Sequence, residues 1–144
     1  MTKPEQTNEK YARRFNEEVR GQRNGDAIDQ LVADDVVGDN AARPEPVRGS
    51  DGVRELADLL YAACPDCGVR LKQIVADGDR IAQRVSVTAT HEGEFMGIDP
   101  TGNPVALTGM DLTRFVDGKW VEGYDLRDML GLFTQRGVIE PPRE

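Results

Sequence analysis

The sequence predicts an α+β fold, in which a curved antiparallel sheet wraps around N-terminal helices and forms a cone with an internal cavity. Apolar residues recur at helical spacing through the first 63 positions, whereas they alternate with polar residues from about position 69 onward. Helices that precede an antiparallel meander typically pack on one face of its sheet. The length of 144 residues fits one domain, 1–144, and we expect positions 1–6 and 138–144 to be flexible tails.

The first half of the chain predicts three helices, each with one apolar face. They cover about residues 7–22, 25–33 and 51–63, and Ser50 is suited to cap the third helix. Between the second and third helices, Val36 and Val37 read as a short strand that a loop follows. The apolar face of the first helix consists of Tyr11, Ala12, Phe15 and Val19, and that of the third consists of Val53, Leu56, Leu59, Leu60 and Ala63.

The second half predicts four strands and a terminal helix. The strands cover about residues 69–75, 80–91, 105–116 and 119–127, and the helix covers 128–136. A tight turn at Asp117 and Gly118 joins the last two strands into a hairpin. Alternation places Asp111 on the same strand face as Leu107, Gly109, Thr113 and Phe115, and places Asp125 with Val121 and Gly123, against Trp120, Glu122 and Tyr124. The hairpin could therefore bring both carboxylates to one end of one sheet.

Asp125 and Asp111 are the first candidate catalytic residues. A carboxylate on an inward strand position loses part of its hydration, which suits it to take up and return a proton. Two such carboxylates in one cavity repel each other, so that a proton is readily shared between them. The alternatives are structural: Asp125 could pair with Arg127 or cap the following helix, and Asp111 could pair with Arg114.

His91 is the third candidate catalytic residue, because it shares a strand face with apolar residues. It could donate a hydrogen bond to a substrate oxygen or orient a carboxylate, although a lone histidine in such a place is more often structural. The candidate substrate-binding residues are apolar wall positions of the expected cavity: Phe15, Leu60, Phe95, Leu107 and Phe115.

Composition and motifs argue against several kinds of partner. The formal net charge of -8 is unsuited to nucleic acid or to an anionic membrane surface, since both require cationic patches. No apolar run approaches the roughly 20 residues of a membrane span, and the polar start lacks a secretory signal, so we expect a cytoplasmic protein. Cys64 and Cys67 form a CxxC pair that lacks further ligands, which indicates reduced thiols. No glycine-rich phosphate loop follows a strand, and we expect neither a metal nor a cofactor.

The motifs of the second half resemble those of one known family. They are HxGxFxGIxPTG at 91–102, TGxDLxRF at 108–115, DGK at 117–119 and YDxxDMLGLxxQxG at 124–137. In this order and spacing they are similar to the SnoaL-like polyketide cyclase, or ester cyclase, family, and the resemblance extends from about residue 8. It implies the α+β cone shared with nuclear transport factor, ketosteroid isomerase and scytalone dehydratase, assembled as homodimers or homotetramers through the sheet.

The resemblance also implies a reaction. In the aromatic polyketide cyclases of this family an aspartate on the last strand acts as general acid/base in an intramolecular aldol condensation, without metal or cofactor. That aspartate corresponds to Asp125, and the position that helps to polarise the substrate corresponds to Asp111. The cyclases carry a histidine at this second position, so the chain departs from the family pattern there. Lyase or isomerase chemistry on a small hydrophobic carbonyl substrate is the first expectation.

Two other interpretations remain open. The same cone supports isomerases, dehydratases and limonene-type epoxide hydrolases, and the last of these use two aspartates with an arginine to activate water. Against the hydrolase, Arg114 faces away from Asp111 by strand alternation. The other interpretation is a ligand-binding module without turnover, because one fold hosts many functions.

Overall fold

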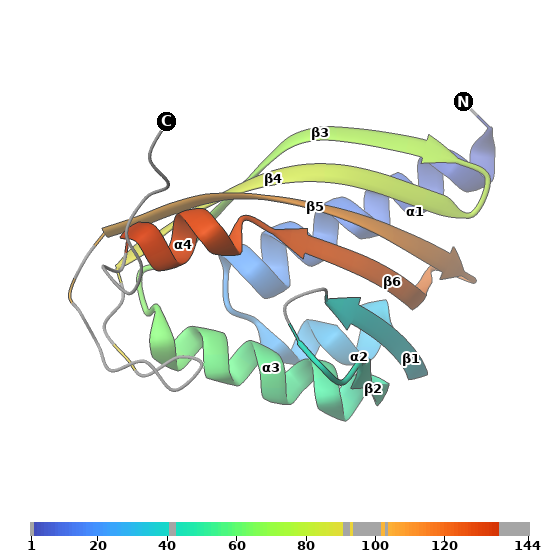
Figure 1. Ribbon diagram of the computed structural model, residues 1–144. Helices are drawn as coiled ribbons and strands as arrows, with labels where there is room; N and C mark the ends of the chain where they lie inside the picture. Colours follow the sequence, from blue (N-terminus) through green and yellow to red (C-terminus); the bar gives the residue numbers. More distant parts are fainter. Residues whose placement is uncertain (1, 41–42, 91–92, 94–101, 103, 136–144) are drawn as a thin grey trace.

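The computed structural model of the chain describes residues 2–40, 43–90, 93, 102 and 104–135, and it has helices on both faces of one curved sheet (Figure 1). The helices are α1 (Lys3–Arg14), the π-helix η1 (Phe15–Gly21), the 3-10 turn η2 (Gly25–Ala27), α2 (Ile28–Leu31), α3 (Gly49–Ala63) and α4 (Met129–Gln135). The strands are β1 (Val32–Asn40), β2 (Val47–Arg48), β3 (Gly68–Asp77), β4 (Arg80–Thr90), β5 (Pro104–Val116) and β6 (Lys119–Arg127). Among the described residues, no helix combines the length and apolar character that a membrane crossing requires.

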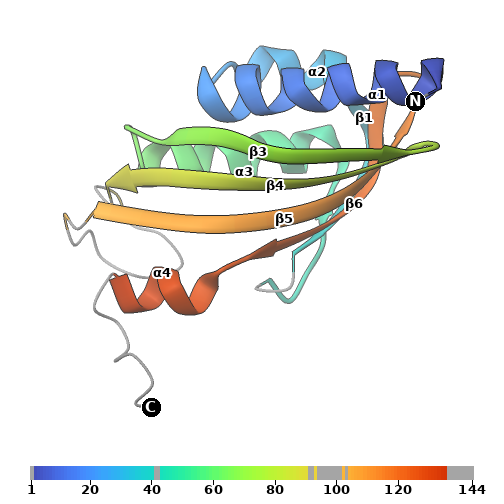
Figure 2. The same cartoon turned by 90° about the horizontal axis from the view of Figure 1, so that it is seen from above.

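The six strands form a single sheet in the order β2-β1-β6-β5-β4-β3. The neighbouring pairs are antiparallel except for β1 and β6, which run parallel. Helix α1 lies against β3 and β4, and α3 lies against β1 and β2, so both cover the inner face. Figure 2 shows α4 on the opposite side of the sheet from α1. These contacts confirm the predicted α+β architecture and add one parallel strand pair to its antiparallel sheet.

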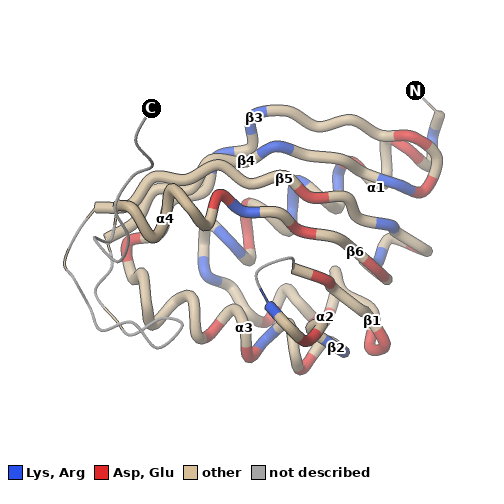
Figure 3. The backbone as a smooth tube through the Cα atoms, viewed as in Figure 1, with Lys and Arg blue, Asp and Glu red and all other residues tan. Residues whose placement is uncertain are grey.

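The hydrophobic core lies between the inner face of the sheet and the helices. Its larger cluster of buried residues is Val19, Ala27, Ile28, Leu31, Val32, Val36, Val53 and Ala57. A smaller cluster consists of Ala12 from α1 and of Ile81 and Phe115 from the sheet. Acidic and basic residues are interspersed over helices and strands (Figure 3).

The N-terminal helix begins earlier than expected and changes its winding. Residues 3–6, predicted to be a flexible tail, form the first turn of α1. There Thr2 and Glu5 form a capping box, and Glu5 also accepts a hydrogen bond from Gly78 N. The remaining part of the predicted helix is the π-helix Phe15–Gly21. Such π segments are rare and are frequent at functional sites.

The helix before β3 is rotated from its predicted orientation. It begins at Gly49, and Ser50 lies inside its first turn instead of capping it. Its buried residues are Val53, Ala57 and Ala63, so Leu60 is 42% exposed and does not form the expected cavity wall. The small alanines let the helix approach the sheet more closely than the leucines would.

Strands β3 to β6 confirm the predicted second half almost residue for residue. The tight turn places Asp117 at φ 51° and Gly118 at φ 77°, as a two-residue hairpin requires. The predicted face of Trp120 was wrong. Alternation placed it opposite to Asp125, but an irregularity in the β5–β6 register turns it into the core beside Phe15. Strand β1 is also longer than the expected Val36–Val37 pair, since parallel pairing with β6 extends it to Asn40.

Candidate active site

A row of polar side chains crosses the inner face of the sheet. In the strand register Asn40 lies opposite Asp125, Asp125 opposite Asp111, and Asp111 opposite Gln83. Directly opposed residues on neighbouring strands have Cβ atoms about 4.5–5.5 Å apart. The structure therefore brings the two predicted aspartates together, and it adds a carboxamide at each end of the row.

Asp125 accepts hydrogen bonds at its Oδ2 atom. Asn40 Nδ2 donates to it over 3.0 Å and Arg127 Nε over 3.1 Å. The same Nε also lies 3.1 Å from Oδ1, but without hydrogen-bond geometry, and Oδ1 is buried with no hydrogen-bond partner in the described part of the chain. The ion pair with Arg127, considered above as a structural alternative, is thus present. Its position on the inner face makes it part of the site.

Arg127 is held in an enclosed position beside the two aspartates. Its side chain is 17% exposed, and its guanidinium lies over Gly109, where any Cβ would overlap it. Burial lowers the pKa of Arg127 below its usual value, and Arg20 lowers it further, whereas Asp125 and Asp111 oppose the shift. An arginine nevertheless stays charged at neutral pH. Its Nη1 atom finds no partner among the described residues and is a free donor for a ligand oxygen.

Asp111 is the more deeply buried carboxylate, with a side-chain exposure of 3%. Its Oδ2 accepts from Gln83 Nε2 at 3.0 Å, and Arg20 Nη1 lies 3.5 Å away. Its Oδ1 is buried and has no partner within the described ranges. The alternative pair with Arg114 is not formed, because Arg114 Nε donates to Glu122 over 2.9 Å, away from Asp111.

Sequence reasoning named Arg127 only as a structural partner of Asp125, and it missed Arg20 and the two carboxamides of this site. Arg127 shares a strand face with Asp125, so strand alternation alone could have indicated it. Gln83 lies between the fully buried Ile81 and Val85 on β4, and a glutamine on such an apolar face was a usable signal. Arg20 carried no such signal, because nothing in its helical pattern indicated a π-helix.

A small, partly open cavity of about 30 Å³ lies beside Arg20 and Gln83, between η1 and the sheet. Its other lining residues are Ala12, Phe15, Thr113, Phe115 and Trp120. Such a volume holds a water molecule or two, not an organic substrate. Phe15 and Phe115 lie where the sequence predicted walls, whereas Leu107 is half-buried and does not line this space. His91 and Phe95 lie outside the described residues.

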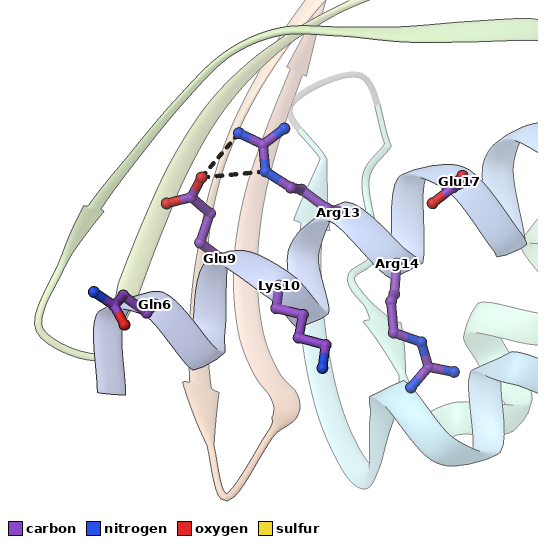
Figure 4. Close-up of a pocket in the computed structure, with 6 residues that line it drawn as sticks. All are labelled: Gln6, Glu9, Lys10, Arg13, Arg14 and Glu17. Atoms are coloured by element: carbon purple, nitrogen blue, oxygen red, sulfur yellow. Dashed lines mark hydrogen bonds and ion pairs between the residues drawn. The ribbon is translucent and has the colours of Figure 1, made fainter. Parts of the chain in front are cut away.

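Within the polar row, Asp125 is the more accessible of the two aspartates. The Asp125 side chain is 27% exposed, compared with 3% for Asp111. A larger hollow of about 380 Å³ lies elsewhere, along the exposed side of α1 (Figure 4). It contains the Glu9–Arg13 ion pair at 2.8 Å, and its Arg14 is paired with Glu18 at 2.6 Å. This hollow contains no member of the polar row, so it is not the candidate active site although it is the larger of the two spaces.

Metal ligands are not grouped in the described parts of the chain, where no cluster of three His, Cys, Asp or Glu residues occurs. Cys64 and Cys67 lie at the turn after α3 and are not joined in a disulfide. Burial raises the pKa of the Cys67 thiol, and the neighbouring Cys64 adds to this effect. A thiol with a raised pKa is a poor nucleophile at neutral pH.

Comparison with known proteins decides the family. The model of the SnoaL-like polyketide cyclases matches residues 10–136. The chain belongs to this family. Among solved structures, AclR, a candidate hydroxylase from Streptomyces galilaeus, is similar with 31% identity and a TM-score of 0.83, over 97% of this chain and 87% of AclR.

Two further solved structures are similar to this SnoaL-like protein. IdmH, a candidate polyketide cyclase from Streptomyces antibioticus, has 28% identity and a TM-score of 0.75, over 94% of this chain and 99% of its own. An LEH-like epoxide hydrolase from M. tuberculosis has 16% identity and a TM-score of 0.71, over 92% and 91% of the two chains, and shows the shared fold alone. No curated protein matches the chain significantly.

Proposed function

We propose that this SnoaL-like protein is an acid/base enzyme that acts on a small, neutral, largely apolar substrate bearing a carbonyl group. One observation carries the proposal: Asp111 and Asp125 lie directly opposite each other, and each has a buried oxygen without a protein partner in the described chain. Buried polar groups are normally paired, and unpaired ones often mark a ligand or a catalytic role. With a proton on Asp111, the charges of Asp125, Arg20 and Arg127 leave the site one positive charge, which suits a neutral substrate whose oxygen becomes negative during the reaction.

The favoured reaction is a cyclase-type intramolecular aldol condensation. Asp125, the carboxylate nearer to solvent, removes a proton from carbon beside a carbonyl. Arg127 Nη1 and Asp111 are placed to stabilise the enolate oxygen, because preorganised donors act most strongly where charge develops. The enolate carbon attacks a second carbonyl of the folded substrate, and Asp125 returns its proton to the new alkoxide. The similarity to IdmH supports this choice.

Proton exchange from a simple ketone tests the first step. We would incubate 1-tetralone with the protein in D2O and follow loss of the signal of the protons beside its carbonyl by NMR. The wild type should accelerate exchange, and D125N should reduce the rate by about 100-fold or more, as expected for loss of a general base. D39N is the matched control, because Asp39 is exposed at the position of β1 next to Asn40. Equal rates for D125N and the wild type would refute the base assignment.

Hydrolysis of an epoxide is the second candidate, and a specific observation favours it. The orientation of Arg114, away from Asp111, argued against a hydrolase. Arg127 and Arg20 instead supply an arginine on the same face of the sheet as the two carboxylates. Asn40 and Asp125 could hold a water molecule, and Asp111 could protonate the epoxide oxygen. Incubation of styrene oxide in H2(18)O would decide between the candidates: incorporation of label into the diol, dependent on both aspartates, identifies the hydrolase. If neither probe reacts, a ligand-binding module becomes the better interpretation.

A further inference from the structure

Four polar side chains form a closed hydrogen-bonded ring between the π-helix and the sheet. Asn16 Nδ2 donates to Gln83 Oε1 at 2.7 Å, and Gln83 Nε2 donates to Asp111 Oδ2 at 3.0 Å. Arg20 Nη1 closes the ring, lying 2.9 Å from Asn16 Oδ1 and 3.5 Å from Asp111 Oδ2. As whole residues Asn16, Gln83 and Asp111 are 5%, 6% and 7% exposed, so the bonds among these three are shielded from bulk solvent.

The direction of every bond in the ring is determined by two groups whose polarity is fixed. Asn16 Nδ2 also donates to the Ala12 carbonyl over 3.1 Å, and a carbonyl only accepts. At the other end of the same amide, Arg20 can only donate. Asn16 therefore presents its NH2 group to Gln83, and Gln83 must turn its own NH2 group toward Asp111. A flipped amide at either position would place two donors or two acceptors together.

This order makes the two oxygens of Asp111 unequal. Oδ2 accepts from Gln83 and faces the Arg20 cation, so a proton taken up by Asp111 belongs on Oδ1. Oδ1 is the buried atom that lacks a partner in the described residues, and Asp125 lies opposite Asp111 in the register. The charged groups near Asp111 are Arg20 from η1 and Asp125 and Arg127 from β6, whereas β4 contributes the neutral Gln83.

We propose that Asn16, Arg20 and Gln83 are positioning residues that hold Asp111 with Oδ1 as its proton-exchanging oxygen. The inference rests on the proposed acid/base function. When charge develops on the substrate oxygen, the O–H bond at Oδ1 breaks, the proton moves to that oxygen, and the new carboxylate is stabilised by Gln83 and Arg20. The proton returns to Oδ1 at the end of the cycle.

Burial costs support a role beyond packing. The neighbours of Gln83 on the inner face of β4 are Ile81 and Val85, both fully buried. Replacement of buried polar sets by apolar residues of similar volume is often neutral or stabilising. A ring that served packing alone would thus gain nothing from its amides. The presence of the four polar side chains instead fits a requirement for orientation of Asp111.

The first test needs no substrate. In protein labelled with 15N and 13C, scalar coupling across the hydrogen bond should connect Gln83 Nε2 with Asp111 Cγ. A measured coupling establishes that Gln83 donates to Asp111. Its absence from well-resolved spectra, or a coupling in which Gln83 accepts, would overturn the proposal, whatever the outcome for turnover.

The second test separates positioning from stability. Q83M preserves side-chain volume but removes the donor, so the 1-tetralone exchange rate should fall about tenfold or more. The thermal unfolding midpoint should fall as well, because Asp111 Oδ2 and Asn16 Nδ2 each lose a buried partner. Q73M is the matched control, because Gln73 is exposed on β3. Q83E keeps the acceptor for Asn16, and its rate relative to the wild type at the same pH should rise as pH falls, because the new carboxyl donates only when it carries a proton. If Q83M exchanges 1-tetralone protons at the wild-type rate, the positioning proposal is overturned. If the wild type acts on neither 1-tetralone nor styrene oxide, the proposed function is refuted, and the scalar coupling alone tests the hydrogen-bonded ring.

Discussion

Gly109 lies directly opposite Arg127 in the β5–β6 register, and the Arg127 side chain occupies the space that any side chain at 109 would fill. A Cβ atom there would overlap the guanidinium of Arg127. The glycine therefore has a site-specific role: it lets a cation of β6 cross above β5 and reach the two aspartates. Its φ angle is not in the left-handed region, so backbone strain is not the reason for a glycine here.

The G109A variant should therefore displace Arg127 and reduce activity. Because the displaced atoms belong to a flexible side chain, we expect a modest loss of stability, on the order of 1 kcal/mol. Exchange on 1-tetralone should nevertheless fall about tenfold or more, since the donor Nη1 leaves the site. G25A is the control, because a Cβ at Gly25 meets nothing within 4 Å. An active G109A enzyme would show that Arg127 is not needed in its present position.

Asn40 should control how Asp125 is oriented. It is one of two side chains that donate to Asp125 Oδ2 in the described structure, and Arg127 is the other. N40A leaves the ion pair in place but frees the carboxylate to rotate, so we expect kcat to decrease about tenfold with little change in KM. N40D keeps the size and adds a like charge beside Asp125, so its loss should be larger. If N40A and N40D behave like the wild type, Asn40 has no part in the site.

The sequence predicted the central part of the site because that part depends on local rules. Asp111 and Asp125 lie on two strands joined by one short turn, so alternation and hairpin geometry place them together. The other parts depend on contacts between distant segments. Asn40 reaches the row only because β1 pairs in parallel with β6, and Trp120 turns inward only through a register irregularity. Arg20 depends on the π-helix, which helical periodicity does not reveal.

Alkaline pH should weaken the fold through Tyr61 and Cys67. Burial raises the pKa of Tyr61 above its usual 10.0, with a further contribution from Asp58, and burial also raises the pKa of Cys67 above its usual 9.0. Each proton is bound more tightly in the folded chain than in the unfolded chain. The resulting stabilisation is complete below the unfolded pKa values and is lost as pH rises through the folded ones.

Urea unfolding measured at several pH values above about 8 would test this linkage. The free energy of unfolding should decrease as pH rises, and the slope should be shallower in C67A and in Y61F. Y61F also loses the hydrogen bond from its hydroxyl to the Val19 carbonyl, so it should be less stable at every pH. A slope that neither variant changes would contradict the assignment.

Self-association is expected through the outer face of the sheet. There Met110 lies opposite Leu126, and Leu112 lies opposite Tyr124. All four side chains are exposed and together form one apolar patch. Contiguous exposed apolar surface of this kind usually marks an interface. Arg84 on β4 borders Met110, and Asp39 on β1 borders Tyr124. A twofold axis parallel to the strands would place the basic margin of one copy over the acidic margin of its partner.

The L126R variant should therefore convert a dimer into a monomer in size-exclusion chromatography with light scattering. Leu126 is 61% exposed, so a charge there should not affect folding of the single chain, but it would be buried without a partner at the interface. L59R is the matched control, since Leu59 is 58% exposed on α3. High salt should weaken the wild-type dimer if the charged margins contribute. A wild-type monomer at high protein concentration would refute self-association, and an L126R dimer would place the interface elsewhere.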